Sequence, residues 1–358
     1  MADLSRFSRL SRLGQKRPPV ILILVLIVFL GACQVDSSMI NPLPGDIVAN
    51  IPDGMSIKEA KTLSSLDQIS DFPLYTMVYE GNIPSGVESS ATRRYLEEPA
   101  WACSLFAAYG DLDEIVYGRN FDWDFSPALL LFMDPPGGYA SVSMVDIHYL
   151  GFGGEQAFGI TDLPLAERVG LLEAPNMPFD GMNEAGLVVG MAAVPPGGME
   201  VDPAKETVDS LMVIRKILDG AASVNEAVAI IRSYNIDMGN TPIHYLISEK
   251  SGRSALIEFS KDEIVVLPNK DPWQMATNFL MSETRTDPGI HCGRYGTIEE
   301  KLTDLEGSIK PRQAMRLLED VAQLSTQWSV VYRVSAGEIW VVMGREYNQV
   351  HKIESGFE

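Results

Sequence analysis

Residues 101–106 (WACSLF) and residues 118–123 (GRNFDW) are two short strand-like stretches, separated by a turn at residues 110–113 (GDLD). This spacing predicts adjacent antiparallel strands, which bring Arg119 and Asp122 back beside Cys103. A surface hairpin in which the arginine and the aspartate pair in solvent has the same pattern. The rest of the chain decides between these two interpretations.

The sequence on either side of these stretches predicts blocks of strands and blocks of helices. Strands are predicted at residues 72–79, 104–108, 115–120, 129–133, 141–149, 186–194, 244–248, 254–259, 263–267, 328–332 and 338–343. Helices are predicted at residues 56–67, 209–218, 223–234 and 311–324, where apolar residues recur at helical spacing. Because the two types alternate as groups and not as single βαβ units, the order favours antiparallel sheets with helices outside them.

Composition indicates a globular protein of one or two domains. The chain has 358 residues, 46% of them hydrophobic and 21% charged, with a net charge of −20. This acidity argues against a nucleic-acid partner. The four histidines show no metal-ligand spacing, and the chain has no phosphate-binding loop and no Gly-x-Ser-x-Gly motif. We therefore expect neither a metal nor a cofactor.

Residues 1–32 have the pattern of an export signal. Five basic residues precede a 13-residue apolar run, which is shorter than the roughly 20 residues that span a bilayer. The run ends in Leu-Gly-Ala-Cys33, which resembles the lipobox of bacterial lipoproteins, so Cys33 is expected to be the acylated mature N-terminus. An ordinary secretory peptide or an uncleaved anchor is the alternative. Residues 33–55 have the composition of a tether, and the sequence predicts a location outside the cytoplasm with membrane attachment at the N-terminus only.

Three cysteines exclude a framework in which every cysteine is paired within the chain. With Cys33 assigned to lipid, Cys103 and Cys292 remain. They either form one structural disulfide or leave one thiol free to act as a nucleophile.

Four ordered motifs resemble one known family. Cys103-Ser-x-Phe is followed by residues 118–123 (GRNFDW), residues 179–187 (FDGMNEAGL), residues 276–278 (ATN) and Arg294-Tyr295. They resemble the N-terminal nucleophile hydrolases of the choloylglycine hydrolase, penicillin V acylase and acid ceramidase group. The long region before the cysteine is more similar to the acid ceramidase and N-acylethanolamine amidase branch, or to its bacterial linear-amide relatives, than to bile salt hydrolases.

The resemblance implies that the bond before Cys103 is cut, so that one residue supplies both a thiol and an α-amine. An α-amine titrates near 7.7–8.0 and suits proton transfer at neutral pH, whereas a free thiol with a pKa near 8.5 needs a base or a cation. The freed amine takes the thiol proton, the sulfur attacks an amide carbonyl, and the amine then protonates the leaving nitrogen. Before the cut, the same sulfur can attack the preceding carbonyl in an N-to-S shift.

Roles for four further residues are implied by the same resemblance. Arg119 is expected beside the sulfur, where it favours the thiolate, and Asp122 is expected to accept a hydrogen bond from the Cys103 amine. Asn278 is expected to donate to the oxyanion. Arg294 is expected to complete the charge network.

The sequence also departs from the family pattern at one position. Thirteen residues after Asp180, bile-salt-hydrolase-like members carry an asparagine that donates to the oxyanion, whereas this chain has Ala193, where only a backbone N–H can serve. This puts bile salt hydrolysis in doubt. Asn183 and Glu184 are interpreted as structural turn residues, and Cys292 as a buried or loop cysteine and not a second nucleophile.

Together these inferences predict an α+β fold, a four-layer αββα sandwich with mainly antiparallel sheets. Residues 56–102 are expected to be a propeptide or small α-chain that stays docked, and residues 103–358 the catalytic domain. The expected function is hydrolysis of a linear amide in an N-acylated small molecule or lipid. Acyl transfer to an amine on the same scaffold, or a non-catalytic ligand-binding lipoprotein, are the alternatives. Apolar residues such as 129–133 line an acyl pocket or simply fill the core, and the oligomeric state stays open.

Overall fold

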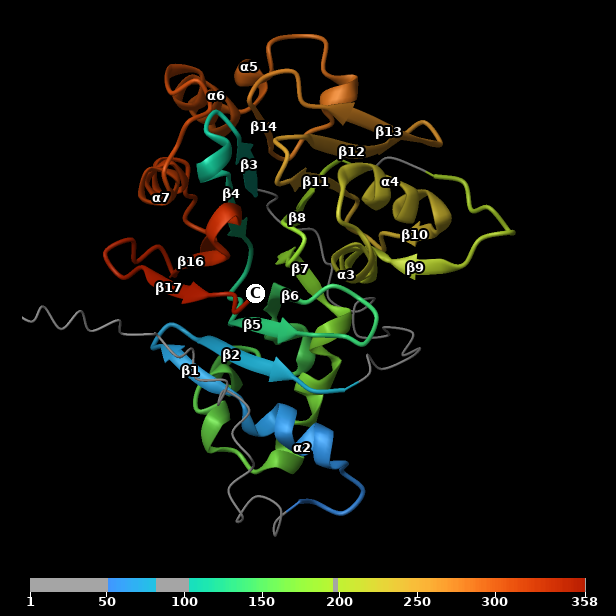
Figure 1. Ribbon diagram of the computed structural model, residues 1–358, viewed down its shortest axis with the longest axis vertical. Coiled ribbons are helices and arrows are strands. Elements are labelled where there is room, and N and C mark those ends of the chain that lie inside the picture. The colour runs from blue at the N-terminus through green and yellow to red at the C-terminus, as the bar shows by residue number, and fades with distance from the viewer. Residues whose placement is uncertain (1–50, 82–102, 196–198, 358) are drawn as a thin grey trace, which may run out of the picture. The chain divides into compact units, whose positions relative to one another are not determined.

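The computed structural model describes residues 51–81, 103–195 and 199–357 (Figure 1). They belong to one compact unit. The expected signal segment, the expected lipidation site Cys33, most of the tether and Ala102 lie outside the described residues. None of the described helices is long and apolar enough to cross a membrane.

Two large sheets form the centre of the described chain. The nine-stranded sheet has the order β1 (Asp67–Ser70), β2 (Leu74–Tyr79), β5 (Ala128–Met133), β6 (Ser141–Asp146), β7 (Pro178–Asn183), β8 (Leu187–Ala193), β11 (Ile243–Glu249), β12 (Ser254–Ser260) and β13 (Glu263–Pro268). The six-stranded sheet has the order β14 (Trp273–Ala276), β3 (Ser104–Ala108), β4 (Val116–Asp122), β15 (Thr326–Arg333), β16 (Glu338–Met343) and β17 (His351–Glu354). A separate parallel pair joins β9 (Thr207–Asp209) and β10 (Asn235–Asp237).

Helices cover each sheet. They are α2 (Ile57–Ser64), α3 (Ser210–Gly220), α4 (Val224–Ser233), α5 (Pro288–His291), α6 (Gly293–Asp304) and α7 (Pro311–Asp320). Helices α3 and α4 contact β7, β8, β11 and β12 of the nine-stranded sheet, while α6 and α7 contact β3, β4, β14 and β15 of the six-stranded one. The sheets meet where β3 contacts β8 and β11.

The burial pattern of β3 explains this order. Leu105 and Ala107 belong to the hydrophobic core between the sheets, and the alternate residues Phe106 and Ala108 belong to a second core shared with α6 and α7. Because side chains alternate along a strand, a strand buried on both faces lies between two layers. The prediction of an α+β fold with mainly antiparallel sheets is confirmed, and the contacts run in the order helix, sheet, sheet, helix.

The described segment before Cys103, residues 51–81, contributes to the nine-stranded sheet. Helix α2 begins at a capping box, in which the Glu59 backbone N–H donates to Ser56 Oγ at 3.2 Å and the Ser56 N–H donates to the Glu59 carboxylate at 2.6 Å. Strand β2 pairs with β5, the one parallel pair in the two large sheets among the described residues. Residues 51–81 are therefore built into the nine-stranded sheet.

Several predicted elements end earlier than their periodicity indicates, among them the helix at residues 311–324, which ends at Asp320. The helix at residues 56–67 ends at Ser64, because the Ser65 hydroxyl turns back to the Thr62 carbonyl at 2.7 Å and accepts from the Val78 N–H at 2.9 Å. The strand at residues 141–149 ends at Asp146, whose carboxylate accepts from the His148 N–H at 2.9 Å and starts a short 3₁₀ turn.

Candidate active site

Cys103 lies directly before β3, with a side chain that is only 4% exposed. In the β3–β4 register Leu105 pairs with Arg119, so the arginine lies on the same face of the sheet as Cys103, two residues along the strand. Burial raises the pKa of the Cys103 thiol, an effect that Arg119 and Arg294 oppose. A thiol in this environment is protonated at neutral pH until a base is supplied.

Arg119 is fully buried between the sheets. Its Nη1 donates to the Phe179 carbonyl at 2.9 Å and to the Asp180 carboxylate, whose other oxygen accepts from the Tyr332 hydroxyl at 2.5 Å. Burial works to lower the pKa of the guanidinium, but Asp180 and Cys103 reverse the shift and keep it charged. The cation also lies 5.0 Å from the centre of the Phe121 ring. Arg119 is thus a fixed positive charge near the Cys103 sulfur.

Asp122 ends β4 and is also fully buried. Its Oδ1 accepts from the Thr326 hydroxyl, and its Oδ2 has no hydrogen-bond partner among the described residues. Burial raises the pKa of this carboxyl to about 6. The backbone N–H and the charge of Asp122 both act on the Cys103 sulfur, which places the carboxylate beside the nucleophile.

Arg294, in the first turn of α6, connects three parts of the site. Its Nη1 donates to the Cys103 backbone carbonyl and to Ser104 Oγ at 2.9 Å, and its Nη2 donates to Asn278 Oδ1 at 3.0 Å. Asn278 in turn donates through Nδ2 to the Ala193 carbonyl at 2.8 Å. The structure therefore brings Cys103 together with Arg119, Asp122, Asn278 and Arg294, although their strands are far apart in sequence.

The segment that follows Asn278 is held by a buried carboxylate. Glu258 on β12 accepts from the backbone N–H groups of Met281 at 2.7 Å and Ser282 at 2.8 Å. The ring of His244 on β11 lies 3.5 Å from the same carboxylate. Although burial alone would raise it, the pKa of Glu258 is lowered by the hydrogen bonds from His244 and Ser282. Sequence reasoning missed Glu258, because no local pattern marks a lone glutamate in an apolar strand.

The remaining residues of the motifs make structural contacts. Asn183 donates through Nδ2 to the carbonyls of Leu218 and Ala221 at 2.9 and 2.8 Å, and its Oδ1 accepts from the Leu187 N–H at 3.1 Å. Glu184 accepts from the Ala140 N–H at 3.1 Å. Both side chains fasten the β7–β8 turn.

The alternative of a disulfide between the two later cysteines is wrong for this structure. Cys103 and Cys292, the two cysteines that the structure describes, are both free. Cys292 is half-buried and stands at the N-cap of α6, two residues before Arg294. It therefore has the place of a loop cysteine at the start of a helix.

An apolar pocket lies beside Cys103, which is one of its lining residues. Its walls include the aromatic side chains of Phe121, Trp123, Tyr149 and Phe179. Phe121 stacks on Trp123 with ring centres 6.0 Å apart, and Tyr149 stacks on Phe179 at 5.8 Å. Strand β5, which covers the expected lining residues 129–133, is buried in the core and does not line this pocket.

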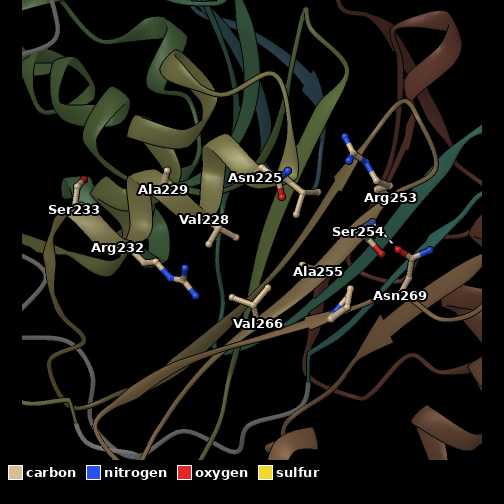
Figure 2. A pocket seen from close by; sticks show the side chains of 12 residues that line it. Asn225, Val228, Ala229, Arg232, Ser233, Arg253, Ser254, Ala255, Val266 and Asn269 are labelled. Atoms are coloured by element: carbon tan, nitrogen blue, oxygen red, sulfur yellow. Dashed lines mark hydrogen bonds between the residues drawn. The ribbon is translucent and has the colours of Figure 1, made fainter.

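A second, larger groove lies away from Cys103, between α4 and strands β12 and β13 (Figure 2). Val228 on the helix points toward Val266 on the sheet, with Arg232 and Arg253 toward different ends. Its polar floor is internally paired, since the Ser254 N–H donates to the Asn269 amide oxygen at 3.0 Å. None of the five predicted site residues lines it.

Cys103 thus lies beside a buried guanidinium and a buried carboxylate, between two mainly antiparallel sheets of an α+β fold. Residues 103–278 match the model of the linear amide C–N hydrolases, choloylglycine hydrolase family. This stretch, just under half of the chain, has the features of the family that its motifs resemble, and the expected class of hydrolase acting on linear amide C–N bonds is confirmed.

Two solved structures of one enzyme share the fold at low sequence identity. Two variants of the conjugated bile acid hydrolase from Clostridium perfringens are 17% and 16% identical, with TM-scores of 0.51 and 0.52, and in each case 72% of this chain and 93% of the other is covered. Penicillin V acylase from Agrobacterium tumefaciens is 16% identical with a TM-score of 0.49, over 70% of this chain and 86% of the other. A search of curated protein sequences gives no significant match.

Proposed function

We propose that this protein is an exported, lipid-anchored amidohydrolase that cleaves a linear amide of an N-acylated small molecule or lipid through a Cys103 thioester. One observation carries the proposal: Cys103 lies near Arg119 and Asp122, is bonded through its carbonyl to Arg294, which also holds Asn278, and lines an apolar pocket. A thiol, charges of both signs and amide donors at one point are the groups that amide cleavage requires.

Cutting the chain before Cys103 supplies the missing base. In the intact chain the Cys103 nitrogen is an amide and has no basic lone pair, and the buried thiol is neutral. The cut converts this nitrogen into an α-amine, whose pKa near 7.7–8.0 suits proton exchange at neutral pH. The unpaired Asp122 Oδ2 is placed to accept a hydrogen bond from the amine and orient it.

The steps of the proposed reaction then use the α-amine, the thiol, Asn278 and water. The amine takes the thiol proton, and Sγ adds to the amide carbonyl carbon to give a tetrahedral oxyanion. Asn278 has two amide hydrogens, of which one is donated to the Ala193 carbonyl, so the other remains for the oxyanion. The ammonium protonates the leaving nitrogen, the C–N bond breaks, and the acyl thioester is hydrolysed by a water that the amine deprotonates.

Export and lipid attachment are proposed from the sequence of residues 1–33. The pairing of β2 with β5 supports the view that the N-terminal segment stays docked after cleavage. Through this pairing, β1 and β2 are joined to the other seven strands of the nine-stranded sheet. The lipid on Cys33 then holds the catalytic chain only through this docking. Metabolic labelling with a radioactive fatty acid tests the anchor, since Cys33→Ser is expected to lose the label and release the protein from membranes.

The decisive experiment combines N-terminal sequencing with an activity panel. Wild-type protein is expected to show a chain beginning at Cys103 and to hydrolyse members of an N-acyl amide panel. Cys103→Ala is expected to lose both properties, whereas the control Cys292→Ala keeps both. Fully active protein whose residue 103 is still joined to Ala102 refutes the mechanism.

A further inference from the structure

Strand β13 forms a free edge of the nine-stranded sheet, because β12 is its one partner strand among the described residues (Figure 1). Just after the strand, the Asn269 N–H donates to the Ser254 carbonyl of β12 at 3.1 Å. Backbone groups alternate in direction along an antiparallel strand, so the N–H and C=O groups of Ile264 and Val266, and the Pro268 carbonyl, point away from β12. These outward groups form no hydrogen bond within the described chain.

The side chains on one face of this edge are apolar and only partly covered. Ile264, Val266 and Pro268 share the face that looks toward α4, and Val266 and Pro268 line the groove beneath that helix (Figure 2). Their neighbours on β12, Ile257 and Phe259, are 0% and 4% exposed, whereas Ile264 and Val266 are half-buried. An apolar edge strand with unbonded backbone groups is suited to pairing with a further strand.

The charges at the two ends of β13 indicate which strand fits. Lys261 and Asp262 precede it, Lys270 and Asp271 follow it, and all four residues are exposed and form no ion pair within the described chain. Lys261 and Asp271 are each five positions from Val266, and Asp262 and Lys270 are each four positions from it. An antiparallel second β13 centred on Val266 therefore brings opposite charges together at both ends, although each chain carries a net charge of −20.

We propose that β13 is the interface of a homodimer, in which the β13 strands of two copies pair antiparallel about a two-fold axis at Val266. The two Val266 residues exchange N–H···O=C bonds, and the Ile264 N–H of each copy donates to the Pro268 carbonyl of the other. Proline is tolerated in this place because it removes a donor only from the edge. The pairing joins the two nine-stranded sheets into one, and its two-fold symmetry closes the assembly at two copies.

Disulfide cross-linking tests the register of this pairing. Cα atoms of a hydrogen-bonded antiparallel pair lie about 5.5 Å apart, which a disulfide can span. Mild oxidation of the full chain, in a Cys292→Ala background that removes the half-buried thiol, should therefore link copies of Val266→Cys into a covalent dimer. Ile264→Cys is the matched control on the same face, because the two copies of position 264 are then roughly 14 Å apart. It should form at least 5-fold less covalent dimer, and equal linking of both variants overturns the proposed register.

Sedimentation of the full chain in detergent tests the dimer itself. Wild-type protein is expected to have the mass of two chains at high concentration and to dissociate on dilution. Val266→Lys places two ammonium groups opposite each other on the axis and should raise the dimer Kd by at least about 10-fold. The control Val78→Lys adds the same charge to β2 of the same sheet, at a position that is 52% exposed, and should leave the Kd unchanged.

The urea midpoint of each lysine variant shows whether it is folded. A wild type that is monomeric at every concentration overturns the proposal and leaves the groove beside β13 to a different ligand. A dimer that Val266→Lys does not weaken also overturns it, since the two copies then meet through another surface.

Discussion

Arg294 donates a hydrogen bond to the backbone carbonyl of Cys103, so the guanidinium holds the main chain of the nucleophile and not its sulfur. The same side chain also holds Ser104 Oγ and Asn278 Oδ1. One arginine therefore fixes Asn278 relative to Cys103, the proposed oxyanion donor and the proposed nucleophile. This is a positioning role, to which its charge adds a weaker effect on the thiol.

Replacing Arg294 is predicted to impair catalysis more than folding. Arg294→Gln removes the donor that joins Cys103 to Asn278, and misplacement of an oxyanion donor typically costs 10²–10³ in kcat. We expect kcat to fall by about 100-fold with a smaller change in KM. The matched control is Arg285→Gln, since Arg285 is exposed in the preceding loop. Equal kinetics for both variants and the wild type would remove Arg294 from the site.

The raised pKa of Asp122 predicts that the stability of the uncut chain depends on pH. Its pKa of about 6 lies above the ordinary value of 3.8, so the folded state holds the proton more tightly than the unfolded state does. The uncut protein should therefore lose stability as pH rises from about 4 to above 6, by up to roughly 3 kcal/mol. In the Cys103→Ala background, which stays uncut, Asp122→Asn should be the more stable protein at pH 7.5.

Urea unfolding at several pH values measures this effect. Below about pH 4 the Cys103→Ala protein and its Asp122→Asn derivative should have the same stability, because the aspartate is then protonated in both folded and unfolded chains. In the cut enzyme the freed amine pairs with the carboxylate, so the penalty should disappear. A difference between the two uncut proteins that does not change with pH contradicts the assignment.

The hairpin around Cys103 could be predicted because all its information is local. A single turn separates the two strands, and the alternation of side chains along each strand determines which residues share a face. The capping box of α2 is equally local. Asn278 and Arg294 could be assigned only by resemblance to a family, because no short-range pattern brings them to Cys103.

Strand β7 shows why other parts escaped prediction. Its sequence, PFDGMN, reads as a polar turn, yet all its residues are buried. Asp180 is neutralised by Arg119, and a Cβ at Gly181 would lie 2.7 Å from the Val142 carbonyl, so only glycine allows the close approach. The pocket beside Cys103 could not be predicted for a similar reason, since its walls come from several elements that only the tertiary fold brings together.

The buried pair of Arg119 and Asp180 is predicted to be a stability element as well as part of the site. Asp180→Asn leaves a fully buried guanidinium without its counter-charge, which typically costs about 3–5 kcal/mol. Tyr332→Phe removes a single hydrogen bond to the same carboxylate and should cost about 1 kcal/mol. Denaturant unfolding of both variants measures the difference. Equal, small losses would show that Arg119 finds another partner.

Glu258 is predicted to position Asn278 without taking part in the chemistry. Glu258→Gln keeps one acceptor oxygen but no charge, so the N–H groups of Met281 and Ser282 are held less firmly and Asn278 shifts. We expect kcat to fall by about 10-fold with little change in KM, because the apolar pocket does not include this residue.

The control for this prediction lies on the neighbouring strand. Glu263 begins β13 and is exposed, so Glu263→Gln removes the same charge from the sheet without touching the segment after Asn278. If both variants lower kcat equally, the effect comes from the general field of the protein and not from anchoring. If only Glu258→Gln does so while its chain is still cut before Cys103, the carboxylate acts by fixing the oxyanion donor, since cleavage shows that the nucleophile itself remains in place.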